Sequence, residues 1–405
     1  MSIIVQKFGG SSVANAERIQ RVAKRVGETA AAGNQVVVIV SAMGDTTDDL
    51  IALARQLTQN PSRREMDMLL ATGEQQSIAL LAMALNEMGY AAISLTGPQA
   101  GYHTDGIFAK AKILEIAGER VKQELDNGNI VVVAGFQGID AIGDINTLGR
   151  GGSDTSAVAM AVALKADVCE IFTDVDGVYT ADPRVVKKAW KMPQVSYDEM
   201  LEMAAMGALV LQPRSVEIAK QYGIKLHVRS SFNYSEGTIV LEEVTMNENI
   251  EKEYVVIGVA HDMNVLKVNI FDVPDQPGIA SKIFSALAKE KVNVDMIVQA
   301  GKQSEYQEIS FTTGRDDQDK VKKVLDGLGL INYNLDGTVA KISIVGAGMI
   351  TNPGVAAKMF RILADKGCNI EMISTSEIKV SCIVAQEYVK DAAVALHTAF
   401  GLDAE

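Results

Sequence analysis

The stretch Val5-Gln-Lys-Phe-Gly-Gly-Ser-Ser12 determines how the first half of the chain is interpreted. An apolar run, Ile3–Phe8, predicts a buried strand, and two glycines and two serines separate it from a helical pattern that begins at Ala16. Glycines let the backbone approach a phosphate closely, and a helix N-terminus offers free N–H groups and a positive dipole end. Lys7 adds a mobile positive charge at the strand tip. The segment predicts an anion-binding loop, although a tight turn beside a surface lysine would explain it equally well.

The same alternation of strand and helix continues through the first 240 residues. The expected strands are Ile3–Phe8, Val36–Val40, Ala91–Leu95, Ile130–Ala134, Val168–Thr173 and Lys225–Val228, and the expected helical stretches include Ala16–Ala32, Met66–Met88 and Ala109–Asn127. This order is typical of an α/β fold with a parallel sheet covered by helices on both faces, a three-layer αβα arrangement. Such sheets bind ligands at the carboxyl ends of their strands, where the glycine-rich segments fall.

The second part of the chain contains an internal repeat. Residues 277–297 and 353–373 align without gaps at an offset of 76 residues, and ten of the 21 positions are identical. A strand precedes each copy and another follows it, so each predicts a small β-α-β-β unit that pairs with its twin. Two copies suit a shared ligand pocket, although a purely structural duplication is the simpler interpretation. The acidic stretch 242–253 is interpreted as a linker.

Composition excludes several classes of function. The chain has 405 residues, 48% of them hydrophobic, and a net charge of −13 that is divided almost evenly between residues 1–245 and 246–405. This acidity argues against binding to nucleic acid or to an anionic membrane. Three cysteines without paired spacing and four scattered histidines predict no disulfide framework and no metal cluster. With no leader-like N-terminus and no apolar run of membrane length, we expect a cytoplasmic protein.

Two further segments place special residues at strand ends. Gly149-Arg-Gly-Gly-Ser-Asp-Thr155 leads into the helix expected over Ser156–Ala166, and Arg150 could clamp a carboxylate or phosphate. Asp154 could equally be a helix cap. Phe172-Thr-Asp-Val-Asp-Gly-Val-Tyr-Thr-Ala-Asp-Pro-Arg184 follows a strand, and its aromatic and basic residues suit a nucleobase and phosphates, whereas a solvated turn is the alternative.

Two segments carry isolated polar groups. Ser41-Ala-Met-Gly-Asp-Thr-Thr47 follows a buried strand, and Glu74 lies in an otherwise apolar helical region. An unpaired buried carboxylate is costly, so Glu74 is either a cap or the acceptor of an ammonium group. The sequence contains neither a GxxxxGK[ST] loop nor the HRD and DFG motifs of protein kinases.

The three glycine-containing and Asp-rich motifs, in this order, resemble those of aspartate kinases in the amino-acid kinase superfamily, and the duplicated unit resembles their paired ACT domains. The resemblance covers nearly the whole chain and implies an amino-acid kinase domain at 1–245, one ferredoxin-like ACT domain at 264–332 and a second built from 253–261 plus 338–405. It implies transfer of a phosphoryl group from ATP to the side chain of L-aspartate, the first step toward lysine, threonine and methionine. Mg²⁺ would be held mainly by the ATP phosphates.

The resemblance also implies roles for individual residues. Lys7 and Asp154 would be catalytic. The aspartate pocket would comprise Ser41, Thr47, Glu74, Arg150, Gly152 and Ser153. The ATP site would comprise Lys7, Gly9, Gly10, Ser11, Thr173, Asp174, Tyr179, Asp182 and Arg184. One position departs from the family pattern, because Leu209 stands where a lysine is usual. We therefore expect weaker ATP affinity, or another cation in that place.

Lysine, threonine or both are the effectors that the resemblance implies, acting through a homodimer or tetramer formed by the ACT domains. The effector contacts would be Asp275, Gln276, Pro277, Gly278, Ile279, Ala280, Asn293, Asp295 and Gln299 in the first copy, and Asn352, Pro353, Gly354, Val355, Ala356, Asn369, Thr375, Ser376, Glu377 and Ser381 in the second. Two alternatives stay open: a kinase of another acidic amino acid, such as glutamate, and an inactive amino-acid sensor that has lost catalysis.

Overall fold

A computed structural model describes residues 1–205, 210–242, 255–299, 306–347, 349, 352 and 354–403. The described chain forms two compact units. The first unit includes Met1–Val178, Lys191–Ala205 and the described residues of 210–242. The second includes Tyr179–Trp190 and the described residues from 255 onward, so a short piece of the N-terminal half belongs to it. The linker expected over 242–253 lies outside the described residues, apart from its first residue.

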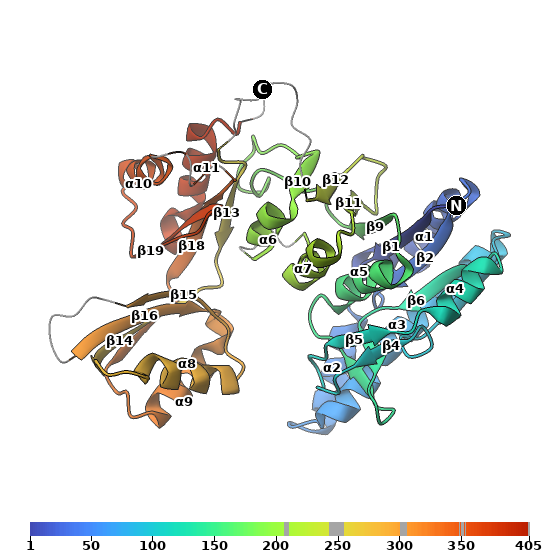
Figure 1. Cartoon of the computed structure of the whole chain (residues 1–405), viewed down its shortest axis with the longest axis horizontal. Coiled ribbons are helices and arrows are strands. Elements are labelled where there is room, and N and C mark those ends of the chain that lie inside the picture. The colour runs from blue at the N-terminus through green and yellow to red at the C-terminus, as the bar shows by residue number, and fades with distance from the viewer. Residues whose placement is uncertain are drawn as a thin grey trace. The chain divides into compact units, whose positions relative to one another are not determined.

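An eight-stranded sheet forms the centre of the first unit (Figure 1). Its strands, in spatial order, are β10 (Gln194–Ser196), β12 (Thr238–Leu241), β11 (Leu226–Ser230), β9 (Val168–Thr173), β1 (Ile3–Phe8), β2 (Gln35–Val40), β6 (Ile130–Ala134) and β3 (Ala92–Leu95). All neighbours are parallel except β11 and β12, so the predicted parallel sheet has one antiparallel pair. The carboxyl ends of β1, β2, β6 and β9 therefore share one edge.

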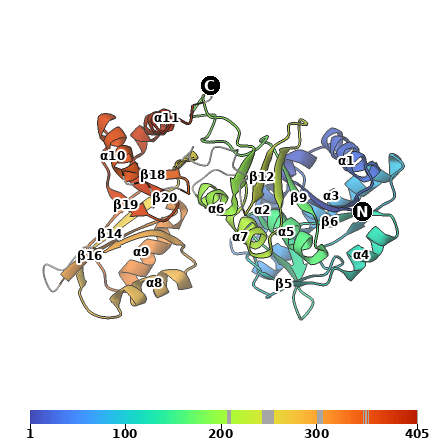
Figure 2. The same ribbon diagram turned by 45° about the horizontal axis from the view of Figure 1, so that its top comes forward.

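Helices cover both faces of this sheet (Figures 1 and 2). On one face, α1 (Ala16–Ala31) and α3 (Arg63–Glu87) pack on each other and on the even-numbered side chains of β2, such as Val36 and Val38. On the other face, α5 (Gly152–Leu164) packs on β1 and on α7 (Pro213–Tyr222). Alternate strand residues point to opposite faces, which explains why β2 is buried on both sides. The expected three-layer α/β arrangement is confirmed.

The remaining elements of this unit are η1 (Gly10–Val13), α2 (Thr46–Leu57), α4 (Glu119–Asp126), α6 (Tyr197–Ala205) and a small sheet of β5 (Ile113–Ile116), β4 (Tyr102–Thr104), β7 (Gln137–Ile139) and β8 (Ile145–Thr147). The helix expected over Ala109–Asn127 is wrong in its first half. Ile113–Ile116 pairs with β4 as a strand instead, and the helix starts at Glu119, directly after Gly118. Local helical spacing was overridden there by pairing with a distant strand.

Among the described helices, α3 is long and apolar enough to cross a membrane by length and composition alone. Its buried residues Ile78, Leu81 and Leu85 pack with the sheet and α1, which identifies it as a core helix.

Each internal repeat forms a four-stranded antiparallel sheet with two helices. The first has the order β15 (Val294–Gln299), β16 (Tyr306–Thr313), β14 (Leu266–Pro274) and β17 (Tyr333–Asp336), with α8 (Ile279–Lys289), η2 (Arg315–Asp317) and α9 (Gln318–Gly327). The second has the order β19 (Met372–Thr375), β20 (Lys379–Ala385), β18 (Val339–Val345) and β13 (Gly258–Asp262), with α10 (Val355–Asp365), η3 (Gln386–Tyr388) and α11 (Val389–Ala399). β13 precedes the whole first repeat in sequence, yet it occupies the place in the second sheet that β17 occupies in the first.

The piece Tyr179–Trp190 packs into the core of the second repeat. Ala181 and Val186 belong to that core, and the Thr180 hydroxyl lies 2.8 Å from Nε2 of the fully buried His397. The backbone N–H of Val259 in β13 also donates to the Thr180 carbonyl at 2.7 Å. A segment that the sequence connects to the eight-stranded sheet is therefore structurally part of the second unit.

Candidate active site

An ion pair marks the carboxyl edge of the large sheet. Lys7 Nζ, near the end of β1, lies 2.7 Å from Asp154 Oδ1 in the first turn of α5, and the two side chains are only 12% and 11% exposed. Strand alternation directs Lys7 to the α5 face, the face opposite α1. Asp154 therefore pairs with the lysine, whereas the cap interpretation has no side-chain hydrogen bond at the start of α5 to support it.

The loop after β1 leaves room only for backbone. A Cβ on Gly10 would lie 2.7 Å from the Ala42 carbonyl oxygen, and one on Gly9 would lie 3.3 Å from Lys7 Nζ. The loop turns directly into η1, where the Ser12 N–H donates to the Gly9 carbonyl, and Ser11 is exposed. An ammonium group beside an uncovered backbone is the environment that a phosphate group requires.

The second glycine-rich segment forms the start of α5. Gly149 and Gly151 adopt φ angles of +78° and +70°, a region that other residues avoid, and Arg150 between them is exposed. A Cβ on Gly152 would lie 2.9 Å from Leu148 and Phe136, so glycine lets the helix begin against the sheet. Ser153 then packs on the backbone that follows β6, because a Cβ on Gly135 would lie 2.9 Å from the Ser153 side chain.

Glu74 is buried in α3 with one carboxylate oxygen satisfied. Its Oε1 accepts a hydrogen bond from the Ala42 N–H at 2.9 Å, whereas no partner for Oε2 is found among the described residues. Burial raises the pKa of this carboxyl group to about 7, against the smaller opposing effect of the Ala42 hydrogen bond. Ser41, beside Ala42 in the loop after β2, and Thr47, in the first turn of α2, are both half-buried. The structure thus brings Ser41 and Glu74 to the edge that also holds Lys7.

The residues expected at the nucleotide are divided between the two units. Thr173 ends β9 and Asp174 follows it in the first unit, whereas Tyr179, Asp182 and Arg184 belong to the second. Asp182 accepts hydrogen bonds from the backbone and guanidinium of Arg184, which lower the pKa of its carboxyl group.

The expected effector residues surround the starts of the two repeat helices. Gly278 and Gly354 precede α8 and α10 with φ angles of +93° and +103°. Asp295 Oδ2 accepts a hydrogen bond from Lys341 Nζ at 2.6 Å, and the Ser381 hydroxyl lies 2.7 Å from that of Ser343. Asn293 directly precedes β15, and Gln299 ends it. The other described members lie at 275–280 and 352–356, which include the first residues of α8 and α10, and at 369–377, which includes β19. Pro353 lies outside the described residues, as does Leu209.

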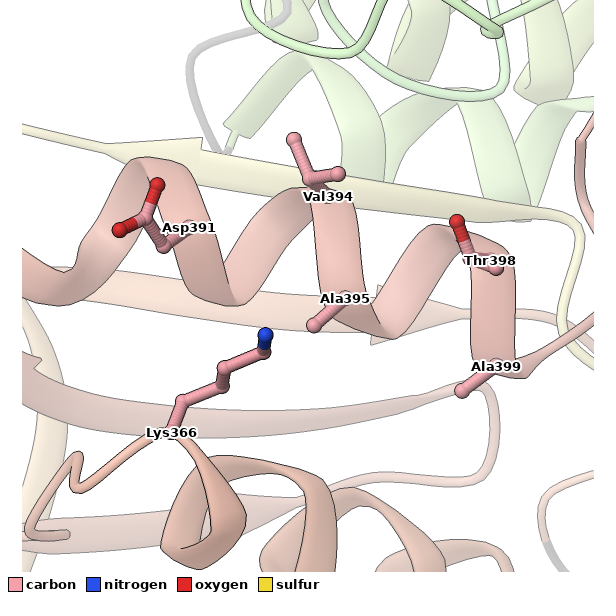
Figure 3. Close-up of a pocket in the computed structure, with 6 residues that line it drawn as sticks. All are labelled: Lys366, Asp391, Val394, Ala395, Thr398 and Ala399. Atoms are coloured by element: carbon pink, nitrogen blue, oxygen red, sulfur yellow. The ribbon is translucent and has the colours of Figure 1, made fainter.

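Two open cavities lie in the second unit. One, of about 590 Å³, runs along α11 beside the end of α10 and is lined by Lys366, Asp391, Val394, Ala395, Thr398 and Ala399 (Figure 3). The other, of about 510 Å³, lies between the two small sheets and includes Lys267, Glu308 and Glu371. Neither contains a residue predicted from the sequence. Within the described ranges, no group of three His, Cys, Asp or Glu side chains is arranged to hold a metal ion.

Asp67 is a structural residue that the sequence did not reveal. This fully buried carboxylate of α3 accepts hydrogen bonds from the Ala109 N–H and from both the N–H and the hydroxyl of Thr147. It fixes the strand β8 that leads to the loop of Arg150. In the sequence, Asp67 and Glu74 are both carboxylates in an apolar helical region. Only the fold shows that Asp67 is fully hydrogen-bonded and structural, whereas Glu74 is not.

Comparison with known proteins identifies the class of this site. A family model described as the amino acid kinase family matches residues 2–230, and models described as ACT domain match residues 268–329 and 342–400. The chain is 55% identical to the aspartokinase of Bacillus sp. (strain MGA3), over 99% of this chain and 98% of that protein. The chain therefore belongs to the amino acid kinase family and, within it, to the aspartokinases with two C-terminal ACT domains.

Solved structures agree with this assignment. E. coli aspartokinase III in complex with aspartate and ADP (R-state) is 26% identical and superposes with a TM-score of 0.83, covering 98% of this chain and 99% of that one. The same E. coli enzyme in complex with lysine and aspartate (T-state) gives a TM-score of 0.76 at the same identity and coverage.

Proposed function

We propose that this chain transfers the γ-phosphoryl group of ATP to the side-chain carboxylate of L-aspartate at the carboxyl edge of the eight-stranded sheet. The observation that carries the proposal is the Lys7–Asp154 pair, 2.7 Å apart, beside a glycine loop with no space for side chains. The ADP and aspartate of the E. coli relative support the choice of nucleotide and acceptor.

The reaction needs no general base. The side-chain carboxylate of aspartate is ionised at neutral pH, so it attacks the γ-phosphorus without first losing a proton. The bond from the γ-phosphorus to the β,γ-bridging oxygen breaks, and the products are 4-phospho-L-aspartate and ADP. The protein then has two tasks, which are positioning the two anions and neutralising their charge.

Lys7 neutralises the transferring phosphoryl group, and Asp154 holds the lysine side chain in place. Gly9, Gly10 and Ser11 approach the phosphates with their backbone, as do the first N–H groups of α5. An acidic protein of net charge −13 can therefore bind two anions because local cations and helix ends reverse the sign at this edge. Mg²⁺ would further neutralise the ATP phosphates, which with water supply most of its ligands.

The aspartate pocket is built around Glu74. Its Oε2, for which no partner is found in the described part of the chain, accepts the α-ammonium group of the substrate, and Arg150 binds the α-carboxylate. Ser41, Thr47, Gly152 and Ser153 complete the pocket. Thr173, Asp174, Tyr179, Asp182 and Arg184 bind the nucleoside part of ATP.

The two ACT domains bind lysine, threonine or both at the loops before α8 and α10 and at β15 and β19. The lysine complex of the E. coli relative supports this effector class. Feedback inhibition requires two states with different effector affinity, which a homodimer or tetramer formed by the ACT domains provides. The proposed domain limits are 1–245, 264–332 and 253–261 plus 338–405.

Release of ADP tests these assignments. It should be measured with aspartate, with glutamate and without acceptor, and each reaction repeated with lysine, threonine and both. We expect ADP release with aspartate as acceptor but not with glutamate or without acceptor, and we expect at least one effector to inhibit it. Turnover with glutamate but not aspartate would indicate a kinase of another acidic amino acid, and effector binding without turnover would indicate a sensor.

A further inference from the structure

A layer of aromatic rings and arginines lies next to the proposed phosphate loop, and it includes Arg229, whose guanidinium carbon is 5.7 Å from the Phe172 ring centroid. The rings of Phe8 and Phe172 stack with centroids 4.6 Å apart and planes within 2°. Phe8 immediately precedes Gly9, and Phe172 immediately precedes Thr173. The stack therefore joins residues near the carboxyl ends of two neighbouring strands, at the edge where ATP is proposed to bind.

Arg25 extends this layer from α1. Its guanidinium carbon lies 4.9 Å from the Phe172 ring centroid and 4.3 Å from that of Tyr234, and the side chain is buried. The same guanidinium donates hydrogen bonds to the backbone carbonyls of Ser230, at 2.6 Å, and Asn233. One planar group thus fixes two backbone carbonyls and contacts two rings, which suits arginine and not lysine.

The loop that Arg25 holds is bonded to the proposed nucleotide site. The segment 230–235 begins at Ser230, the last residue of β11, and the Ser231 N–H donates to the Thr173 carbonyl at 2.9 Å. A second arginine of α1, Arg18, lies two turns before Arg25 and contacts the phosphate loop itself. Arg18 donates to the Ser11 carbonyl of the phosphate loop and lies 5.1 Å from the Phe232 ring centroid.

We propose that Arg25 is a positioning residue for ATP: through the rings of Phe172 and Tyr234 and the carbonyls of the 230–235 loop, it sets where Thr173 lies relative to the phosphate loop. Arg18 has the same role on a smaller scale. This inference rests on the proposed nucleotide site. Arg25 does not touch the reacting atoms, and its hydrogen bonds and ring contacts among the described residues reach no residue of the proposed aspartate pocket, so its removal changes ATP binding and leaves aspartate binding intact.

The test compares Arg25→Lys with Arg21→Lys. Arg21 lies one turn before Arg25 on the same helix, is exposed, and pairs with Glu17. We expect Arg25→Lys to raise the KM for ATP about tenfold and the KM for aspartate less than twofold, whereas Arg21→Lys changes neither. A direct calorimetric titration of each variant with ATP, without acceptor, should give the same loss of affinity.

A merely structural role for Arg25 would lower the fraction of folded enzyme and leave the KM for ATP unchanged, and that result would overturn the inference. An equal rise in both KM values would do the same. If Arg25→Lys fails to fold, Tyr234→Leu replaces it, because Tyr234 is exposed, and about a threefold rise in the KM for ATP is expected. Since the calorimetric titration needs no acceptor, an unexpected acceptor specificity in the wild type leaves it interpretable. No ATP binding by the wild type would instead refute the nucleotide site itself.

Discussion

The two units of this aspartokinase differ in the kind of side chain they bury. Among its described residues, the kinase unit buries six carboxylates, which are Asp67, Glu74, Glu124, Asp154, Glu170 and Glu199. Among the described residues of the ACT unit, no carboxylate is buried, and the buried basic side chains are Lys341 and His397. Both units bury apolar clusters, the kinase unit around its sheet and the ACT unit one in each repeat, so this difference is one of charge.

Buried carboxylates are costly unless they are paired, and their partners separate structure from chemistry. Glu170 accepts hydrogen bonds from Gln6 and Arg229, and Glu124 accepts them from Arg120 and Asn129. Glu74, by contrast, has an oxygen with no partner among the described residues. The partners of Glu170 and Glu124 give these carboxylates a structural role, whereas the second oxygen of Glu74 is the group proposed to accept the substrate ammonium group.

The largest effect is expected from Lys7→Met. Removing the charge next to the transferring phosphoryl group should lower kcat by about 10²–10³-fold, comparable to the loss of one preorganised electrostatic contact elsewhere. Steady-state ADP release measures this, and circular dichroism verifies the fold. The double variant Lys7→Met/Asp154→Asn serves as the control for an unpaired Asp154. A kcat within tenfold of the wild type would remove Lys7 from the catalytic group.

Glu74→Gln tests whether the Glu74 carboxylate binds the ammonium group of the substrate. Glutamine keeps the acceptor for the Ala42 N–H but cannot attract an ammonium ion, so the KM for aspartate should rise about 10- to 100-fold. Because the pKa of Glu74 is about 7, the wild-type KM for aspartate should fall as pH rises toward 7 and level off above it. The variant should lack this pH dependence. A wild-type profile without a change near pH 7 would contradict the role of Glu74.

The same carboxyl group affects stability with a definite sign. Its pKa is raised by burial from 4.5 to about 7 in the folded protein, so the native state binds the proton more tightly than the unfolded chain. Stability is therefore lost as pH rises from about 4.5 to about 7, by roughly 3 kcal/mol. The free energies of unfolding of the wild type and of Glu74→Gln should be measured by urea unfolding without substrate at several pH values. The difference between the two proteins should change by roughly 3 kcal/mol between pH 4.5 and pH 7.

The sequence predicts that candidate site residues lie at the carboxyl edge of the large sheet, but it does not predict all the residues that pack against them. The positions of Lys7 and Asp154 could be predicted because each follows or precedes glycines at a strand or helix end. The cluster of Arg25, Phe172 and Tyr234 could not, because its members are separated by up to about 200 residues and each looks ordinary in its own segment.

Long-range pairing also explains the errors of fold prediction. The strand Ile113–Ile116 forms because β4 is beside it, and no local pattern indicates that neighbour. The incorporation of Tyr179–Trp190 into the second unit likewise depends on apolar contacts of Ala181 and Val186 with residues far along the chain.

A smaller effect is expected at the buried cation of the ACT unit. Lys341 is 7% exposed and pairs with the 41% exposed Asp295. Asp295→Asn leaves the ammonium group buried without its carboxylate and should cost about 1–2 kcal/mol, whereas Lys341→Met should be neutral or stabilising. The single tryptophan, Trp190, belongs to the second unit, so its fluorescence can follow unfolding of that unit. If Lys341→Met were the more damaging variant, the ACT unit would depend on buried charge as the kinase unit does.

The smallest effect should come from the two helix-start glycines of the ACT unit. Gly278 and Gly354 have positive φ angles, and a Cβ at either position would meet no atom of the described residues within 4 Å. Alanine there meets no clash, so each substitution should cost only the backbone strain of about 1 kcal/mol. Gly10 of the kinase unit is the matched contrast, since its Cβ would lie 2.7 Å from the Ala42 carbonyl oxygen. Urea unfolding followed by Trp190 fluorescence should give nearly equal shifts for Gly278→Ala and Gly354→Ala, and Gly10→Ala should instead impair ATP binding. Unequal shifts would mean that one ACT loop packs more tightly than its twin.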